Sequence, residues 1–447
     1  MSVLVYGLAV AGRAVARELA SRGEAVVLVD DAPPADAADF ARAISADLRD
    51  APAAGGHDAL LAGVELLVPS PGLPESHPVF AAAARVGVRV EGELEVGYRL
   101  EAATGAPRPM LGVTGTDGKT TTVRMATAVL RAAGVPAEAV GNTEVPLVAA
   151  LRGDARAFVV ECSSFRLAHV RDFRLEASAW LNFAPDHLDW HGSMATYRAA
   201  KARMWGRARA TDVLVAPTAD PTIVADARRA GGRVVTFGDG GDYRVEAGAL
   251  RGPGGVIARL DDLPRALPHD VADALAASAI AIESGLATPE AAGAALAAYE
   301  HAPHRIQLVA ERGGVRWYDD SKATTPHAAR TAIRAFDSVV LVAGGRNKGL
   351  DLAPLAEESA RLRGVVAIGE AAPDVEAALG ARAVVVRAGS MDDAVEAASR
   401  MAREGDVVLL SPACASYDWY RNYGERGDDF ARAVRARLGL VGAGRSS

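Results

Sequence analysis

A glycine-rich stretch, GVTGTDGKTTT at 112–122, contains the residue types with the clearest chemical use. Backbone N–H groups of such a turn, followed by the positive end of a helix, can face phosphate oxygens. Lys119 would add a positive charge for the β- and γ-phosphates of ATP, and the Thr120 hydroxyl could bind Mg²⁺. The alternative is a strand-to-helix turn without a ligand. The predicted ATP loop consists of Gly115, Thr116, Asp117, Gly118, Lys119, Thr120 and Thr121.

This loop departs from the general phosphate-loop pattern G-x-x-x-x-G-K-[ST]. Counting back from Gly118 and Lys119 puts the first glycine of that pattern at position 113, which is valine. The glycines stand instead at 112 and 115. The loop therefore predicts ATP binding, but it does not match the pattern of the common P-loop ATPases.

Three further stretches contain residues that could work beside phosphates. In VVECSSF, Glu161 ends an apolar run, where a carboxylate can hold Mg²⁺, although a helix cap or an ion pair would also explain it. In NFAPDHLDWHG, Asp186 and His187 follow another apolar run, but a turn with capping residues would look the same. In YRAAKARMW, Lys201 lies on an alanine-rich helix, where a lone lysine is normally solvated.

The elements that must position these residues alternate between strand and helix. Short runs such as SVLVYG, PMLGVT and SVVLVAGG alternate with alanine-rich stretches of helical periodicity. Half of the 447 residues are hydrophobic but only 5% are aromatic, which favours sheets covered by helices over an aromatic-rich sandwich. The chain is too long for one ordinary domain, and EAATGAPRP reads as a linker. We predict three α/β domains, at 1–104, 105–300 and 301–447.

Charge and composition exclude several classes of protein. The net charge is −7 and no basic stripe stands out, so no nucleic-acid partner is expected. Cys162 and Cys414 are too few for a disulfide framework, and both lie in apolar runs that predict small buried side chains. The start, MSVLVYGLAVAG, reads as a first strand, and no apolar run approaches the roughly 20 residues of a membrane span. A soluble, cytoplasmic monomer that acts on small molecules is expected.

The loop in the form T-G-T-x-G-K-T, followed in order by the stretches of Glu161, His187 and Lys201, resembles the Mur ligase family. That resemblance implies a Rossmann-like UDP-binding domain, a central P-loop ATPase-like domain and a Rossmann-like C-terminal domain. It implies catalytic roles for Lys119, Glu161, His187 and Lys201, with ATP and two Mg²⁺ ions as cofactors. Lys201 matches the lysine that reacts with CO₂ to become a carbamate, which is an anionic oxygen ligand. The implied metal ligands are Thr120, Glu161, His187 and carbamylated Lys201.

Motifs in the last third of the chain extend the resemblance. HAPHR places Arg305, and YDDSKATT places Asp320, where the family contacts ATP; Asp273 of HDVAD would join them. AGGRNKGLDL and SPACASYDWYRNYGERG resemble stretches around the amino-acid substrate. The implied amino-acid site consists of Lys322, Thr324, Lys348, Ser416, Tyr417 and Tyr423.

The first domain fits the same family. GLAVAG is close to the dinucleotide pattern G-x-G-x-x-G, but Ala9 replaces the central glycine, so the pattern is weak evidence for a nicotinamide cofactor. The family uses this turn and an S-P-G loop for the UDP group of its substrate. The implied UDP-substrate site consists of Leu8, Ala9, Asp30, Ser70, Gly72 and Asn142.

Within the family, SKAT, GGxxKGxD and SPACAS resemble most the ligase that adds D-glutamate to UDP-N-acetylmuramoyl-L-alanine through an acyl phosphate, a step of peptidoglycan synthesis. Four acidic residues depart from the family pattern, Asp117, Glu144, Asp270 and Asp273, and Arg166 stands where the family has glutamine. A sister ligase for L-glutamate or another amino acid therefore stays open. So do three other classes, a nicotinamide dehydrogenase, a P-loop ATPase for motion or transport, and a binding protein without catalysis.

Overall fold

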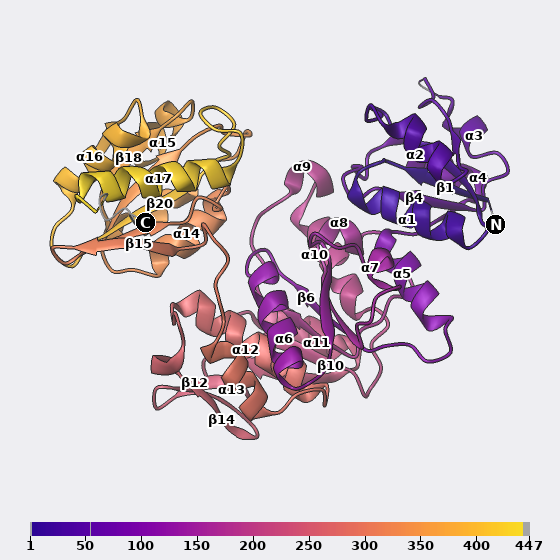
Figure 1. Ribbon diagram of the computed structural model, residues 1–447, viewed down its shortest axis with the longest axis horizontal. Helices are drawn as coiled ribbons and strands as arrows, with labels where there is room; N and C mark the ends of the chain where they lie inside the picture. Colours follow the sequence, from indigo (N-terminus) through magenta and orange to yellow (C-terminus); the bar gives the residue numbers. More distant parts are fainter. Residues whose placement is uncertain (1, 54, 441–447) are drawn as a thin grey trace, which may run out of the picture. The chain divides into compact units, whose positions relative to one another are not determined.

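A computed structural model of the protein describes residues 2–53 and 55–440 (Figure 1). The chain forms two compact units, Met1–Ala266 with Asp270–Tyr299, and Leu267–His269 with Glu300–Ser447. Four sheets with flanking helices make up these units, which confirms the predicted α/β class. No helix among the described residues is long and apolar enough to cross a membrane.

The first sheet has five parallel strands in the order β3-β2-β1-β4-β5. Its central strands are runs of Val and Leu, as expected where helices cover both faces. The strands are β1 (Ser2–Tyr6), β2 (Ala25–Val29), β3 (Asp47–Leu48), β4 (Leu66–Pro69) and β5 (Arg89–Val90). One face is covered by α1 (Val10–Ser21) and α2 (Ala37–Ala43), the other by α3 (His57–Leu60) and α4 (Pro78–Val86).

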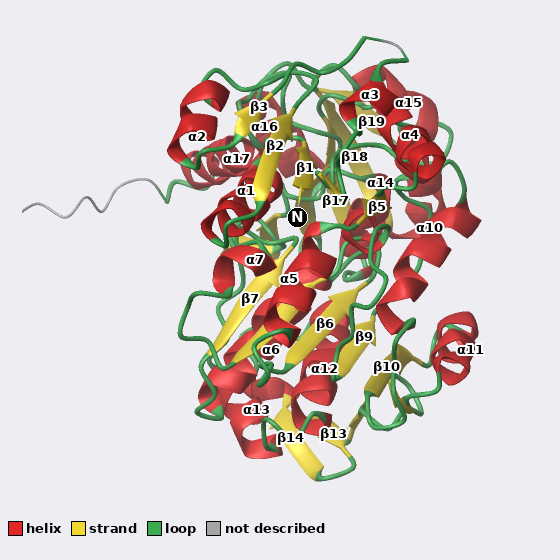
Figure 2. Cartoon of the chain, turned by 90° about the vertical axis from the view of Figure 1, so that its right-hand side faces the viewer, coloured by secondary structure: helices red, strands yellow, loops and turns green. Residues whose placement is uncertain are grey.

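The second sheet has six parallel strands in the order β11-β10-β9-β6-β8-β7, and Figure 2 shows β7, β6, β9 and β10 running in one direction. Loops that leave parallel strands at their carboxyl ends meet at one edge, where open α/β sheets bind ligands. The strands are β6 (Met110–Thr114), β7 (Ala137–Gly141), β8 (Ala157–Glu161), β9 (Ala177–Trp180), β10 (Val213–Pro217) and β11 (Arg233–Phe237).

Helices cover both faces of this second sheet. One core lies under α6 (Lys119–Ala132), α12 (Pro268–Glu283) and α13 (Pro289–Ala297). The opposite core lies under α5 (Glu93–Ala102), α7 (Leu147–Ala150), α8 (Ser164–Leu167) and α11 (Pro221–Ala230). Between β9 and β10 the chain forms α9 (Leu188–His191), α10 (Met194–Ala202) and η1 (Arg203–Trp205). A small antiparallel sheet follows, with β12 (Arg244–Glu246), β13 (Ala249–Gly252), β14 (Gly255–Arg259) and the turn η2 (Leu260–Asp262).

The last sheet, in the second unit, has the order β15-β16-β20-β17-β18-β19. The predicted hairpin is present as the antiparallel pair β15 and β16, and the other strands pair in parallel. The strands are β15 (Gln307–Arg312), β16 (Val315–Asp319), β17 (Val339–Gly344), β18 (Leu362–Ile368), β19 (Val385–Arg387) and β20 (Val407–Ala413). One face is covered by α16 (Met391–Met401) and α17 (Tyr423–Arg437), the other by α14 (Pro326–Arg334), η3 (Ala353–Arg361) and α15 (Ala372–Leu379).

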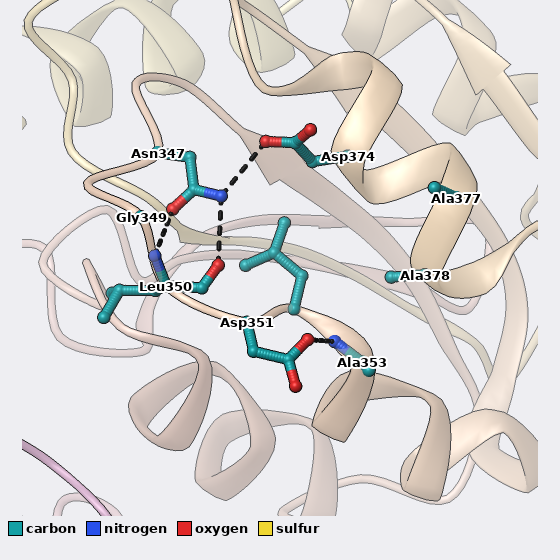
Figure 3. A pocket seen from close by; sticks show the side chains of 9 residues that line it. Asn347, Gly349, Leu350, Asp351, Ala353, Asp374, Ala377 and Ala378 are labelled. Atoms are coloured by element: carbon teal, nitrogen blue, oxygen red, sulfur yellow. Dashed lines mark hydrogen bonds between the residues drawn. The ribbon is translucent and has the colours of Figure 1, made fainter.

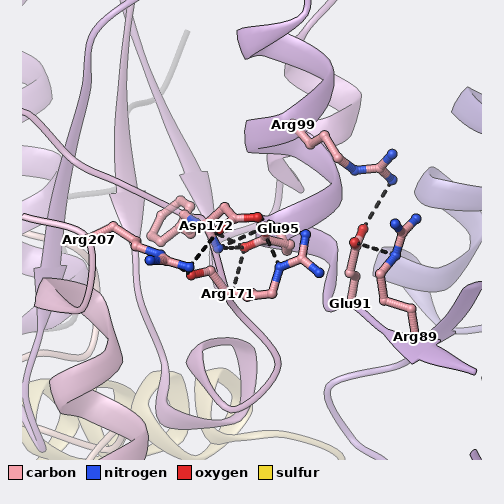
Figure 4. Close-up of polar contacts among 8 residues, drawn as sticks. Arg89, Glu91, Glu95, Arg99, Arg171, Asp172 and Arg207 are labelled. Carbon is pink, nitrogen blue, oxygen red and sulfur yellow. Dashed lines mark hydrogen bonds and ion pairs between the residues drawn. The ribbon is translucent and has the colours of Figure 1, made fainter. Parts of the chain in front are cut away.

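The buried Glu95 carboxylate fixes α5 to the loop before β9, and Glu91 forms ion pairs nearby (Figure 4). The Glu95 carboxylate accepts three backbone N–H bonds from residues 171–173, at 2.8, 3.0 and 3.0 Å. Glu91 pairs with Arg89 at 2.8 Å and with Arg99 at 3.1 Å. A buried carboxylate is costly unless donors or opposite charges compensate it. Backbone N–H groups do so for Glu95, and two guanidinium groups in ion pairs do so for Glu91. The helix that follows the first sheet is therefore held by a segment of the second.

Candidate active site

The predicted ATP loop lies between β6 and α6. Gly118 precedes the first residue of α6 and has a φ of +82°, which favours glycine. A Cβ atom at Gly118 would lie 2.4 Å from Oδ1 of Asp273, so a larger residue would not fit. Asp273 on α12 therefore lies directly against the loop.

The Asn182 side chain, which follows β9, holds the shape of this loop. Its Oδ1 atom accepts the N–H groups of Thr116 at 2.9 Å and Asp117 at 3.0 Å, and its Nδ2 donates to the Asp117 carbonyl at 3.2 Å. These two N–H groups therefore face Asn182 and not an open phosphate site. Sequence reasoning missed Asn182, although a polar residue directly after a buried strand next to β6 was a usable indication.

Two lysine ammonium groups meet at one carbonyl of the loop. The Nζ atom of Lys119 donates to the carbonyls of Gly115 at 2.9 Å and Thr116 at 2.7 Å. The Nζ atom of Lys201 donates to the same Gly115 carbonyl at 2.7 Å and lies 4.6 Å from the centre of the Tyr197 ring. Lys201 is only 1% exposed, so the alternative of a solvated helical lysine is wrong.

The environment of Lys201 disfavours its charged form. Burial lowers the pKa of its ammonium well below the ordinary value, and the nearby charge of Lys119 lowers it further. Asp186 and Asp117 act in the opposite direction but are outweighed. A larger fraction of Lys201 is therefore a neutral amine than is usual for lysine.

Glu161, at the end of β8, has one carboxylate oxygen that accepts a hydrogen bond and one that does not. Its Oε1 atom accepts a hydrogen bond of 3.0 Å from Nδ2 of Asn142. Its Oε2 atom is buried and has no hydrogen-bond partner among the described residues. A buried anionic oxygen without a donor is unfavourable unless a cation binds it. The position of Glu161 therefore fits a hard cation.

His187 is connected to the loop through the side chains of Tyr197 and Thr116. Its backbone has a φ of +53° at the start of α9, and its Nε2 atom lies 3.2 Å from Oδ2 of Asp186. Its ring centre lies 6.1 Å from that of Tyr197, whose hydroxyl lies 3.3 Å from Oγ1 of Thr116. The structure therefore brings His187 and Lys201 to the same loop by way of Tyr197.

No group of three or more His, Cys, Asp or Glu side chains within the described ranges could by itself hold a metal ion. The predicted metal ligands include a threonine hydroxyl and a modified lysine, which are outside those residue types. The Mg²⁺ site therefore stays a prediction, supported by the buried oxygen of Glu161.

Five of the six predicted UDP-substrate residues lie at the carboxyl ends of the first sheet, whereas Asn142 follows β7 of the second sheet and contacts Glu161. Asp30, after β2, accepts the Leu8 N–H at 2.6 Å on its Oδ2 atom and so holds the turn that precedes α1. Gly7 has a φ of +101°, and a Cβ there would lie 2.4 Å from Cβ of Ser70, so these loops touch. Ala9 and Gly72 are exposed on the same two loops.

A polar cluster beside this turn was missed in the sequence. The Tyr6 hydroxyl donates to Oδ1 of Asp31 at 2.6 Å, and Nε2 of His77 lies 3.2 Å from Oδ2 of the same carboxylate. The ring of His57 lies 5.5 Å from that of His77, and burial lowers the pKa of His57. The four residues are too far apart in sequence for spacing to indicate the cluster.

In the second unit, Asp320 is held at the end of β16. Its Oδ2 atom accepts a 2.7 Å hydrogen bond from Oγ of Ser411, and its Oδ1 accepts the Ile306 N–H at 3.3 Å. Burial raises the pKa of Asp320 to about 7, although Ser411 and the charge of Arg305 act against the rise. Asp320 and Arg305, both predicted to contact ATP, are therefore close enough to interact.

Two predicted amino-acid residues are lysines, and each lies over a tyrosine ring. The Nζ atom of Lys322 lies 5.2 Å from the ring centre of Tyr423, and that of Lys348 lies 5.6 Å from the ring centre of Tyr417. An ammonium group over an aromatic face is attracted to it. The other two residues of this predicted site are Ser416, which is buried, and Thr324, which is half-buried.

A buried arginine that sequence reasoning missed joins the segments that carry these lysines. The guanidinium of Arg426 donates to the Ser321 carbonyl at 2.8 Å and Oγ at 3.0 Å, to the carbonyls of Cys414 and Ala415 at 3.1 and 3.2 Å, and to that of Gly344 at 3.4 Å. Burial lowers the pKa of Arg426 to about 10. Arg426 lies on the same buried face of α17 as Phe430 and Val434. A charged residue among these apolar positions was the one feature of the sequence that could have indicated a buried arginine.

We expect Arg426→Met to lower the free energy of unfolding by about 3 kcal/mol, because several buried oxygens would lose their donor. Urea unfolding followed by circular dichroism measures the change. The matched control is Arg435→Met on the same helix, where Arg435 is exposed and a change within about 0.5 kcal/mol is expected. Equal effects of the two substitutions would contradict the role of Arg426.

Two departures from the family pattern have partners in the structure. Asp270 is paired with Arg265 through two contacts of 2.6 Å, so its charge is neutralised locally. Arg166, where the family usually has glutamine, forms a buried ion pair of 2.5 Å with Glu93. Glu144 lies exposed on the loop after β7. None of these three charges is therefore buried without compensation.

Comparison with known protein families gives two matches. The Mur ligase middle domain matches residues 113–252, and the glutamate ligase domain of Mur ligases matches residues 304–414. Two similar proteins are both named UDP-N-acetylmuramoylalanine–D-glutamate ligase. The one from Frankia casuarinae is 43% identical and aligns over 98% of this chain and 95% of its own. The one from Thermobifida fusca is 40% identical and aligns over 98% of both.

Solved structures of lower identity share the fold. The MurF ligase from Thermotoga maritima, solved in complex with ADP, has a TM-score of 0.63 at 17% identity over 94% of this chain and 96% of its own. The UDP-N-acetylmuramate–alanine ligase MurC from the same organism has a TM-score of 0.57 at 18% identity over 99% and 100%. Their similarity supports the α/β architecture described above.

Proposed function

The chain belongs to the Mur ligase family, and we propose that it joins D-glutamate to UDP-N-acetylmuramoyl-L-alanine with ATP in peptidoglycan synthesis. Relatives that carry the name of this reaction are 43% and 40% identical to it over 98% of the chain. The glutamate ligase domain matches the unit that holds Lys322 and Lys348.

The reaction proceeds in two steps. A carboxylate oxygen of the L-alanine residue attacks the γ-phosphorus of ATP, the bond to the ADP oxygen breaks, and an acyl phosphate forms. The amino nitrogen of D-glutamate then attacks the acyl carbon and loses a proton, and the C–O bond to phosphate breaks. The products are ADP, phosphate and the amide.

The single observation that supports this proposal most is the Lys119 ammonium group, which is held at the Gly115 and Thr116 carbonyls of the loop. The first step brings a carboxylate against the negatively charged γ-phosphate, and it is slow unless positive charge offsets their repulsion. Lys119 would neutralise the phosphates, and Asn182 holds the shape of the loop that presents it. This positive charge is built into the edge of the second sheet, where the loops after β6 and β8 meet.

The residues present fit Mg²⁺, with Thr120, Glu161, His187 and Lys201 as its proposed ligands. When bound, Mg²⁺ supplies charge that stabilises the phosphate oxygens of ATP in the transition state. Lys201 would contribute as a carbamate: its neutral amine nitrogen attacks the carbon of CO₂, and one proton leaves. The low pKa of the buried amine supports this modification, because only the neutral form is a nucleophile.

The two other substrates are assigned by charge and position. The UDP group would lie against the turn of Leu8 and the start of α1, where a helix N-terminus favours phosphate. Asn142, beside Glu161, would contact the end of that substrate that reacts. D-Glutamate has two carboxylates, and Lys322 and Lys348 offer two cations.

The test is phosphate release by the purified protein with ATP, Mg²⁺ and UDP-N-acetylmuramoyl-L-alanine, with D-glutamate, L-glutamate and other amino acids added separately. We expect release that requires D-glutamate, with a product whose mass is the sum of the two substrates minus water. Release that requires a different amino acid would move the chain to a sister specificity. A rate of ATP hydrolysis that does not change when any of the amino acids is added would contradict the ligase assignment.

A further inference from the structure

We propose that Asn347 and Asp374 are positioning residues for the amino-acid substrate, because they hold the loop that presents Lys348. The inference rests on the proposed function, in which Lys348 binds a carboxylate of D-glutamate. It adds two residues that touch neither substrate nor nucleotide.

Asn347 closes the loop on itself (Figure 3). Its Oδ1 atom accepts the Leu350 N–H at 2.8 Å, and its Nδ2 donates to the Leu350 carbonyl at 3.0 Å. Both polar groups of one backbone residue are therefore satisfied by one side chain, three positions before it. Lys348 lies inside the ring that these bonds close.

The same amide ties the closed loop to a helix. Nδ2 of Asn347 donates at 3.0 Å to Oδ2 of Asp374, in the first turn of α15. Between the loop and α15 lies a pocket of about 510 Å³, lined by residues of both. Packing therefore leaves part of the space under the loop open, and the Asn347–Asp374 bond is a direct polar link across it.

The other side of the loop is fixed to the segment that carries Tyr417. The Arg346 N–H donates to the Ala415 carbonyl at 2.8 Å, and the Ala415 N–H donates back to the Arg346 carbonyl at 3.1 Å. The Lys348 ammonium lies 5.6 Å from the Tyr417 ring centre. Lys348 therefore follows two anchored residues: Arg346, which is bridged to Ala415, and Asn347, which is linked to Asp374.

These contacts reduce the conformational entropy that the loop around Lys348 must lose when the substrate carboxylate binds. Lysine has a long flexible side chain, and immobilising its backbone in advance lowers the entropy lost on binding. Loss of the Asp374 link leaves Lys348 chemically intact but less well placed. The effect should therefore appear in the binding of the amino acid and not in that of ATP.

The experiment compares Asp374→Ala, Asp374→Asn and Glu376→Ala in the full chain. Asp374→Asn keeps an oxygen that can accept from Asn347. Glu376 lies on the same helix and pairs with Arg387 at 2.9 Å, so Glu376→Ala is the matched control. Steady-state phosphate release gives KM for D-glutamate and for ATP separately, and hydrogen exchange reports the protection of the Leu350 amide.

We expect Asp374→Ala to raise KM for D-glutamate about tenfold, with KM for ATP within twofold, and to speed exchange at Leu350. Asp374→Asn and Glu376→Ala should stay within twofold of the unsubstituted protein on every measure. Equal increases in both KM values, or no increase for D-glutamate, would overturn the positioning role. If the unsubstituted protein released no phosphate with D-glutamate, the proposed function would fail instead, while the exchange at Leu350 would still test the link.

Discussion

Lys119→Ala is expected to lower kcat about 10³-fold, with KM for D-glutamate nearly unchanged. In the transition state of the first step, negative charge is shared between the attacking carboxylate, the γ-phosphate and the ADP oxygen. Removing one well-placed cation or donor from such a site costs about 10²–10³ in rate. The carbonyls of Gly115 and Thr116 already hold the Lys119 ammonium group at the loop before ATP binds.

Rapid-quench measurement of ADP formation tests this prediction, because it follows the first step alone. Arg124→Ala is the matched control: Arg124 is an exposed cation on the same helix, and its loss should change the rate less than twofold. Lys119→Arg should recover only part of the rate, since a planar guanidinium does not occupy the space of a compact ammonium. A kcat for Lys119→Ala within tenfold of the unsubstituted protein would contradict the assignment of this loop.

The places of the loops that carry Lys119 and Glu161 were predictable, because these loops follow apolar strands. Apolar runs before Gly115 and Glu161 predicted β6 and β8, and parallel pairing brings their carboxyl ends to one edge. The class of fold followed from the same alternation of strands and helices. What joins the loops to one another was not predictable in this way.

Asn182 and Arg426 illustrate that gap. Each forms several hydrogen bonds to backbone groups of segments distant in the chain, from Thr116 to Asn182 and from Ser321 to Arg426. Such contacts depend on the three-dimensional approach of loops, which residue spacing does not encode. A polar residue in an apolar register, as Arg426 is on α17, is the one local indication that could have been used.

Lys201 shows how burial alters the meaning of a residue type. On sequence alone a lysine on an alanine-rich helix is a solvated cation, and only the resemblance to Mur ligases suggested otherwise. In the structure the side chain is buried against Tyr197 and donates to the Gly115 carbonyl. Burial is a property of the packed helix α10 against the loop, and periodicity could not distinguish its inner from its outer face with so many alanines.

The second large effect is expected at Lys201. Lys201→Met should lower kcat more than 100-fold, because Lys201 is proposed as a direct metal ligand, and losing a ligand costs at least as much as losing a residue that orients one. The same substitution should leave the thermal midpoint unchanged or raise it. A buried ammonium is desolvated, and an apolar side chain of similar length removes that cost. Loss of activity without loss of stability separates a functional lysine from a structural one.

Dependence on CO₂ tests the modification of Lys201 directly. In buffers stripped of CO₂ the unsubstituted protein should lose most of its activity and regain it when bicarbonate is added, while Lys201→Met should not respond. At limiting bicarbonate the recovery should increase as pH rises, because a higher pH increases the neutral fraction of the amine that attacks CO₂. Since burial lowers the pKa of this lysine, the increase should begin at a lower pH than for an exposed lysine. Full activity without CO₂ would show that Lys201 acts without the carbamate and would contradict its proposed role as a metal ligand.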